Sequence, residues 1–149
     1  MANIGLISDT HGRFEEDWKK HFSRCDMIFH MGDFADKDVY ENFMDLEIPI
    51  QTVRGNCDFG LWAHFLPKTQ IINVEGKNFC LLHNRAFLPD DVDDIDFVIF
   101  GHTHIPTDEV RGGIRFINPG SAGQDRGAGR TMMIMHIDGD SVELEKIPL

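Results

Sequence analysis

Phe97-Val98-Ile99-Phe100-Gly101-His102-Thr103-His104 is the stretch that decides the fold, because an apolar run ends directly in two imidazoles. The run is short and rich in β-branched and aromatic residues, which predicts a buried strand. Similar polar clusters follow three other apolar runs: Ser8-Asp9-Thr10-His11-Gly12, Gly32-Asp33 and Gly55-Asn56-Cys57-Asp58. In open α/β sheets, ligands bind outside the carboxyl ends of the strands. We therefore expect the four clusters to meet in one crevice.

The first third of the chain alternates between strand and helix patterns. Apolar runs predict buried strands at 3–8, 26–31 and 48–53. Two segments between these strands carry apolar residues at helical spacing, 14–22 and 36–47. In the second segment we expect the apolar side chains to turn inward: Val39, Phe43, Met44 and Leu46. This alternation implies parallel strands joined by right-handed crossovers.

The rest of the chain changes to a pattern of hairpins. Three pairs of β-type runs flank short turns, at 69–74 and 78–82, 110–111 and 114–117, and 131–137 and 141–147. The predicted fold class is therefore α/β, with two mixed β-sheets packed face to face and flanked by helices. The acidic run 90–96 lacks the glycine and the closing glutamate of a calcium loop, and we expect it to form a short solvated helix.

Length and composition exclude several classes of protein. The 149 residues correspond to a single domain, 1–149. The net charge of −11 repels nucleic acid backbones, so we expect no long nucleic acid partner. No apolar run approaches the roughly 18 residues of a membrane span and no signal-peptide pattern begins the chain, so we expect a cytoplasmic protein that does not bind membranes. Three widely spaced cysteines predict reduced thiols.

The polar clusters, taken in order along the chain, resemble the motifs of a known family. The matching motifs are Asp9-x-His11, Gly32-Asp33, Gly55-Asn56, His83, Gly101-His102-x-His104 and Asn118-Pro119-Gly120-Ser121. This set is similar to that of the calcineurin-like metallophosphoesterases, and especially to their small bacterial and archaeal phosphodiesterase branch, to which the retromer subunit is related. The resemblance spans nearly the whole chain and implies a four-layer α/β/β/α sandwich.

The same resemblance implies a binuclear metal site. Asp33 resembles the carboxylate that bridges the two metals. The ligands of one metal would be Asp9, His11 and His104, and those of the other Asn56, His83 and His102. Nitrogen and oxygen ligands without a thiolate suit two divalent ions, with manganese favoured and iron, zinc or nickel as alternatives.

The family chemistry implies hydrolysis of a phosphoester by a metal-activated hydroxide. Asp33, Asn56 and His104 are then expected to act in catalysis. Cys57 stands where the larger relatives carry a histidine that assists the leaving group, so we expect weak general-acid catalysis at this position. Asp58, its neighbour, is expected to orient a water or a ligand.

Several further residues have two interpretations. Arg85 either clamps phosphate, since a guanidinium can grip two oxygens, or is a surface arginine paired with an acid. Arg126 resembles an arginine that follows the same Asn-Pro-Gly-Ser turn in relatives, and is a second candidate for substrate binding. A short apolar run either lines a wall for the leaving group or packs beneath its loop: Phe59, Leu61 and Trp62. His30, within an apolar strand, is expected to be packed and not to bind metal.

The sequence thus predicts a divalent-metal-dependent phosphodiesterase that acts on a small phosphodiester. A phosphomonoesterase is one alternative. A second is a non-catalytic scaffold like the retromer relative, which the complete ligand set disfavours. A nuclease of the same superfamily is disfavoured by the acidic balance and the short chain. The oligomeric state, including a homo-oligomer, is left open.

Overall fold

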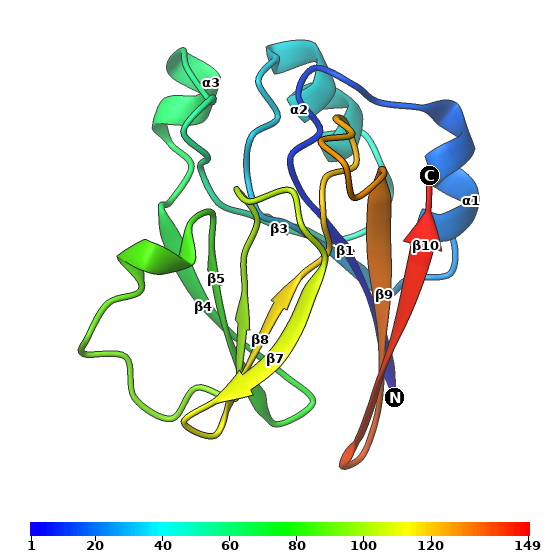
Figure 1. The fold of residues 1–149 in the computed structure, drawn as a ribbon. Helices are drawn as coiled ribbons and strands as arrows, with labels where there is room; N and C mark the ends of the chain where they lie inside the picture. Colours follow the sequence, from blue (N-terminus) through cyan, green and yellow to red (C-terminus); the bar gives the residue numbers. More distant parts are fainter.

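The computed structural model describes residues 1–149 and consists of two five-stranded β-sheets with few helices (Figure 1). The first sheet has the strand order β10-β9-β1-β2-β3. Its strands are β1 (Ala2–Ile7), β2 (Met27–His30), β3 (Ile50–Thr52), β9 (Thr131–Asp138) and β10 (Ser141–Pro148). Strands β1, β2 and β3 are parallel, while β9 pairs antiparallel with both β1 and β10. The first sheet therefore joins the predicted crossover strands to the last predicted hairpin.

The second sheet has the order β4-β5-β6-β8-β7. Its strands are β4 (Thr69–Val74), β5 (Lys77–Leu82), β6 (Phe97–Ile99), β7 (Thr107–Arg111) and β8 (Ile114–Asn118). The central strands β5, β6 and β8 are parallel, and each outer strand closes a hairpin. Both sheets are mixed, which confirms the predicted fold class.

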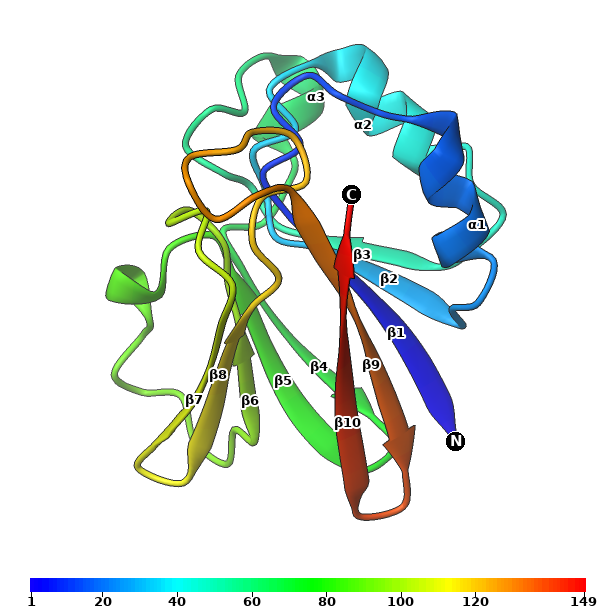
Figure 2. The ribbon, with the colours of Figure 1, turned by 45° about the vertical axis from the view of Figure 1, so that its right-hand side comes forward.

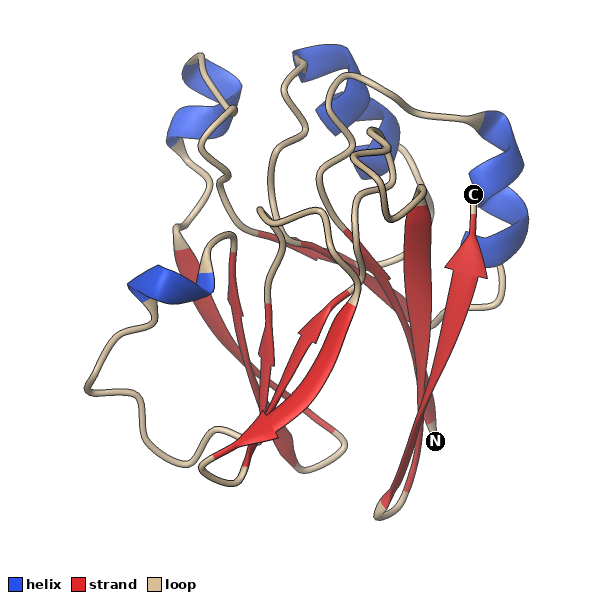
Figure 3. Cartoon of the chain, in the orientation of Figure 1, coloured by secondary structure: helices blue, strands red, loops and turns tan.

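The helices are short and lie mainly beside the first sheet (Figures 2 and 3). They are η1 (Glu16–Trp18), α1 (Lys19–Phe22), α2 (Lys37–Met44), α3 (Leu61–His64) and η2 (Arg85–Phe87). The α2 helix buries Val39 and Phe43, as predicted. Met44 is 39% exposed, so its predicted inward orientation is wrong: it lies next to Phe43 at the last turn, about 100° around the helix from that buried side chain.

Two apolar clusters fill the space on either side of the first sheet. Leu6 and Phe29 point toward the second sheet and join Phe79 and Ile99 in the core between the sheets. The alternate residues of the same strands, Ile7 and Ile28, face the opposite way. They pack against Trp18, Phe22 and Phe43 from the helical segments. The period of two along each strand therefore separates the two layers of core.

The outer face of the second sheet is covered differently from the first. Cys80 and Val98 on this face pack against Leu88 and Val92 from the loop between η2 and β6. The acidic run 90–96 within this loop contains turns and bends but no helix, so the predicted helix is wrong. Its Asp96 carboxylate accepts a hydrogen bond from the Asn78 backbone N–H at 2.8 Å, and this contact holds the run in an irregular conformation.

None of the helices has the length and apolar composition that crossing a membrane requires.

Candidate metal centre

Five of the predicted site residues have left-handed backbone conformations. Their φ angles are 54° for Asp9, 45° for His11, 63° for Asp33, 72° for His102 and 63° for His104. Such angles are uncommon for residues other than glycine, and each costs of order 1–3 kcal/mol. Because these residues follow the ends of β1, β2 and β6, the strained turns bring three separate loops together. Backbone strain is concentrated where the sequence predicted the site.

Two glycines allow the loops to approach closely. A Cβ atom at Gly101 would overlap the side chains of Ser8 and Asp9, and one at Gly55 would overlap the backbone and carboxylate of Asp33. No other residue lacks that atom. The glycines in the motifs therefore let the ligand-bearing loops pack against one another.

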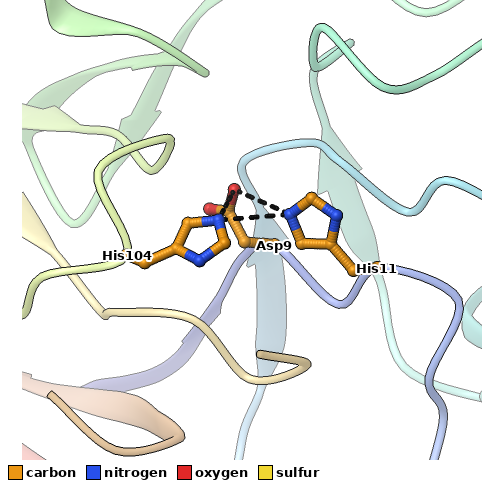
Figure 4. Close-up of side chains that lie close together, drawn as sticks. All are labelled: Asp9, His11 and His104. Carbon is orange, nitrogen blue, oxygen red and sulfur yellow. Dashed lines mark hydrogen bonds and ion pairs between the residues drawn. The ribbon is translucent and has the colours of Figure 1, made fainter. Parts of the chain in front are cut away.

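The first group of converging donors contains Asp9, His11 and His104 (Figure 4). The Oδ1 atom of Asp9 lies 3.2 Å from Nε2 of His104 and 3.6 Å from Nε2 of His11. The two imidazole Nε2 atoms are 3.2 Å apart. Two donors that are each about 2.0–2.2 Å from one cation are about 3 Å apart when they subtend an angle near 90°. The spacing in this group therefore fits a shared metal ion.

Asp33 and His83 form a second group beside the first. Nε2 of His83 lies 3.2 Å from Oδ2 of Asp33 and 3.8 Å from Oδ1 of Asp9. The same Asp33 oxygen is 3.6 Å from Nε2 of His11, so this carboxylate lies between the two groups. This is the position expected of a bridging ligand.

Asn56 and His102 complete the set around the second group. Oδ1 of Asn56 lies 3.2 Å from Nδ1 of His102. The His102 ring also lies edge to face with the His83 ring, with their centroids 5.2 Å apart. The structure thus brings together all seven predicted ligands: Asp9, His11, Asp33, Asn56, His83, His102 and His104.

Several buried polar atoms of the candidate ligands form no hydrogen bond within the protein. Oδ1 of Asp9, Nε2 of His83 and Nδ1 of His104 are buried without any hydrogen bond. An unpaired buried polar atom is costly, and a buried carboxylate especially so. A bound cation would satisfy the first two of these atoms. The residues present therefore fit the divalent metal sites that the sequence predicts.

Charge interactions favour the ionised carboxylates that metal binding requires. Burial opposes ionisation of Asp9, but contacts with His104 and His11 hold the pKa of this carboxyl well below its usual range. Burial likewise opposes ionisation of Asp33, and contact with His83 lowers the pKa of Asp33. The pKa of His83 is raised by the two carboxylates in spite of burial. Both carboxylates are thus available as anionic ligands at neutral pH.

The ring orientation of His83 is set by a backbone group. Its Nδ1–H donates to the carbonyl of Met31 at 2.7 Å, which leaves Nε2 as a lone-pair donor facing Asp33. Hydrogen bonds of this kind commonly fix the tautomer of metal-ligating histidines. The geometry of His83 is therefore that of a ligand.

His30 is packed beneath the site, as predicted. Its ring stacks on Phe34 with centroids 3.6 Å apart. Nδ1 accepts from the Gly32 N–H at 3.1 Å, and Nε2 donates to the Thr10 hydroxyl at 3.1 Å. Burial lowers the pKa of His30 to about 3, so the ring stays neutral. Both ring nitrogens are thus engaged within the protein, and His30 supports the loop that carries Asp9.

The Asn-Pro-Gly-Ser turn supports two ligand loops. The side-chain amide of Asn118 donates to the Gly101 carbonyl and to the Thr103 hydroxyl, each at 3.0 Å. The Ser121 hydroxyl donates to the Asp9 carbonyl at 2.9 Å. The turn thus holds the loop of His102 and His104 and also the loop of Asp9.

Asp58 lies between two of the loops that carry candidate ligands. Its carboxylate is fully buried and accepts three backbone hydrogen bonds, from Asp33 and Ala35 at 2.9 Å and from Gly55 at 2.7 Å. These bonds hold the Asp33 loop against the Gly55 loop, so the structure gives Asp58 a supporting role. The expectation that Asp58 orients a water or a ligand stays a prediction.

Cys57 does face the metal centre. Its Sγ atom lies within 4.8 Å of donor atoms of His11 and Asp33, and its backbone N–H donates to Oδ1 of Asp33 at 2.8 Å. Burial and the nearby carboxylate raise the pKa of the Cys57 thiol. A thiol with a raised pKa is a poor proton donor at neutral pH.

Arg85 matches the second of its two interpretations. Its guanidinium pairs with the carboxylate of Glu109 and lies over the Phe100 ring, 5.0 Å from the centroid. These contacts hold the side chain against the outer face of the second sheet. The structure therefore favours the surface ion pair over the phosphate clamp. The exposed Arg126 donates to Gln124 at 3.1 Å, and the structure brings it to none of the ligands.

We expect Arg85→Ala to leave turnover nearly unchanged. Kinetic constants on a small phosphodiester should stay within about twofold of the wild-type values, as for surface residues remote from the chemistry. Loss of the partly exposed ion pair should lower the free energy of unfolding by no more than about 1 kcal/mol. Steady-state kinetics and urea denaturation test both values. A tenfold rise in KM at unchanged metal content would restore the phosphate clamp.

A cavity of about 700 Å³ opens beside the second ligand group. Its lining includes Asn56, His83 and His102, together with residues that sequence reasoning had not singled out: Arg54, Lys68, Thr69, Leu82, Asn84 and Phe87. Arg54 could have been found, because it directly precedes the Gly55-Asn56 motif. Lys68 and Phe87 lie in segments without any motif. Phe59, one of the residues expected to form an apolar wall, lines this cavity. Trp62, another of them, packs instead against Phe34 and Tyr40.

Two curated relatives match most of this chain. It is 28% identical over 160 residues to a probable metallophosphoesterase of Methanothermobacter thermautotrophicus, with 97% of this chain and 91% of the relative covered. It is 32% identical over 103 residues to the phosphodiesterase YfcE of Escherichia coli, with 63% of this chain and 55% of the relative covered.

Solved structures with lower sequence identity share the fold. An archaeal phosphodiesterase superposes with a TM-score of 0.80 at 23% identity, over 99% of both chains. Vps29 from Chaetomium thermophilum superposes with a TM-score of 0.77 at 18% identity, over 98% of this chain and 95% of that one. At such identities the likeness shows the common fold alone.

The family model for the calcineurin-like phosphoesterase superfamily domain matches residues 2–140. This match covers the second sheet, every strand of the first sheet except β10, and all the loops that carry the predicted ligands. The motifs, the convergent donors and the fold therefore agree, and the chain belongs to the calcineurin-like phosphoesterase superfamily.

Proposed function

We propose that the protein is a divalent-metal-dependent phosphodiesterase that hydrolyses a small phosphodiester. The observation that carries this proposal is the convergence of the candidate ligands, in which Asp33 lies between two groups and the buried atoms Oδ1 of Asp9 and Nε2 of His83 make no hydrogen bond. The likeness to proteins named phosphodiesterases supports the choice of a diester.

The candidate ligands would hold two cations, and the loops that carry them fix their orientation. One cation would be held by Asp9, His11 and His104. The other would be held by Asn56, His83 and His102, and Asp33 would contribute to both sites. Bound divalent cations supply Lewis acidity, a more acidic water and neutralisation of charge on the phosphoryl oxygens. The protein's own contribution is preorganisation, because strained loops and backbone hydrogen bonds hold the ligands in place before substrate binds. We propose manganese first, with iron, zinc or nickel as alternatives, because all seven ligands offer nitrogen or oxygen.

Two alternatives make different predictions. A phosphomonoesterase would use the same ligands on a substrate with one ester bond. A scaffold would need the fold, which Vps29 shares, but would not need buried ligand atoms that lack hydrogen bonds. The complete and mutually oriented ligand set favours an enzyme over a scaffold.

A panel of phosphodiesters and phosphomonoesters, assayed with several divalent metals at confirmed metal content, tests the proposal. We expect turnover of aryl phosphodiesters to exceed that of matched monoesters, and chelation to abolish both. A monoester preference would favour the phosphomonoesterase. Failure of every combination in metal-loaded protein would favour the scaffold.

A further inference from the structure

The lining of the cavity beside the metal centre includes residues that the proposed chemistry does not use. Asn56, His83 and His102 of the lining belong to the candidate ligand set. The same lining brings together two cations and two aromatic rings from separate parts of the chain: Arg54, Lys68, Phe59 and Phe87. A substrate whose phosphoryl group lies at the ligands would place its remaining part in the cavity that these residues line.

Neither cation of the cavity is paired with a carboxylate. The ion pairs of the structure occupy most of the other lysines and arginines, but not Arg54 or Lys68. Arg54 donates only its Nε–H, to the Asp58 carbonyl at 3.1 Å, which orients the guanidinium and leaves its terminal N–H groups free. The acidic residue of the lining, Asp58, faces backbone amides. In a chain of net charge −11, two unpaired cations in one cavity favour an anionic ligand.

Both aromatic residues of the lining are exposed to solvent. Phe59 precedes α3 and Phe87 ends η2, two elements on the same side of the molecule (Figures 1 and 3). Their side chains are 71% and 77% exposed, which is unusual for phenylalanine. Exposed rings beside cations are typical of sites that stack a planar group and bind a phosphate nearby.

This inference rests on the proposed function. We propose that the substrate is a nucleotide-like phosphodiester that carries a second phosphate. Arg54 and Lys68 would bind this second, non-reacting phosphate, while Phe59 and Phe87 contact the planar base. The volume of about 700 Å³ suits a ligand of this size. The four residues would set specificity and take no part in the bond cleavage itself.

Two matched substrates test this inference: thymidine 5′-(4-nitrophenyl phosphate) and the same compound with an added 3′-phosphate. In each reaction water adds to the 5′-phosphorus, the bond to 4-nitrophenolate breaks, and a proton passes to solvent. We expect kcat/KM for the 3′-phosphorylated substrate to be about tenfold higher in wild type, as for one charge-assisted contact. Lys68→Gln and Arg54→Gln should each reduce that ratio toward one. Phe59→Ala should lower kcat/KM for both substrates by about tenfold.

The matched control is Lys146→Gln, which removes an exposed cation of β10 that is also unpaired and lies outside the cavity. It should keep both the wild-type rate and the wild-type ratio. Lys68 is exposed, so its variant tests the inference even if Arg54→Gln fails to fold. Equal kcat/KM for the two substrates in an active wild-type enzyme would overturn the inference and leave the proposed function intact. An inactive, metal-loaded wild type would overturn the proposed function, and the inference with it.

Discussion

Asp33→Asn is expected to remove nearly all bound metal and to lower kcat/KM by about 10³-fold or more. The carboxylate lies between the two ligand groups, 3.2 Å from His83 and 3.6 Å from His11. An amide has nearly the same shape but no charge, so both sites lose their shared anion. The amide oxygen can still accept the hydrogen bond from the Cys57 backbone N–H, and the fold should therefore persist.

Elemental analysis after dialysis against excess metal measures the loss directly. Wild type should bind two ions per chain, Asp33→Asn close to none, and His11→Ala about one. The matched control is Asp140→Asn, an exposed residue of the turn after β9, which should bind the wild-type amount. A wild-type stoichiometry that stays at one under excess metal, or normal metal content in Asp33→Asn, would contradict the binuclear site.

Cys57→His is expected to accelerate hydrolysis of substrates with poor leaving groups by up to about 10²-fold, at the low end of what general-acid catalysis contributes. The wild-type rate should fall steeply as the pKa of the leaving group rises, because the Cys57 thiol has a raised pKa and protonates the departing oxygen poorly. The side chain at position 57 faces His11 and Asp33, so an imidazole placed there can reach the reacting group. The slope of log kcat/KM against leaving-group pKa should become shallower.

A series of aryl and alkyl phosphodiesters provides this slope, and Cys57→Ala provides the control. The alanine variant should keep its metals and the steep wild-type dependence. If instead it loses activity as severely as a ligand variant while its metal content is unchanged, the thiol itself is a catalytic group and the expectation is refuted.

The strand pattern was predictable because it depends on local sequence. Period-two alternation and short apolar runs located all ten strands of the structure to within a few residues, and Gly112-Gly113 marked a hairpin. The helices were less predictable. Met44 was misjudged because it lies about 100° around the last helical turn from the buried Phe43. The acidic run 90–96 was misjudged because the Asp96 contact with Asn78 joins residues distant in sequence.

The convergence of the candidate ligands was predictable for a chemical reason. Histidine, aspartate and asparagine directly after buried strands are exceptions to the burial of apolar residues, and parallel strand ends meet at one edge of a sheet. The roles of Asp58 and Arg85 were not predictable, since a carboxylate or guanidinium can serve either chemistry or structure. Only the three backbone amides around Asp58, and Glu109 beside Arg85, distinguish these uses.

By itself, the sequence determined the order of the strands along the chain, because strands follow from residue types and their spacing, and its motifs sufficed to identify the family by resemblance. The tertiary structure alone decided which polar side chains face the metal centre and which hold its loops. It also decided that Arg54, Lys68, Phe59 and Phe87 share one cavity. Such neighbours come from separate loops whose left-handed turns and close glycine contacts form only when the two sheets pack together.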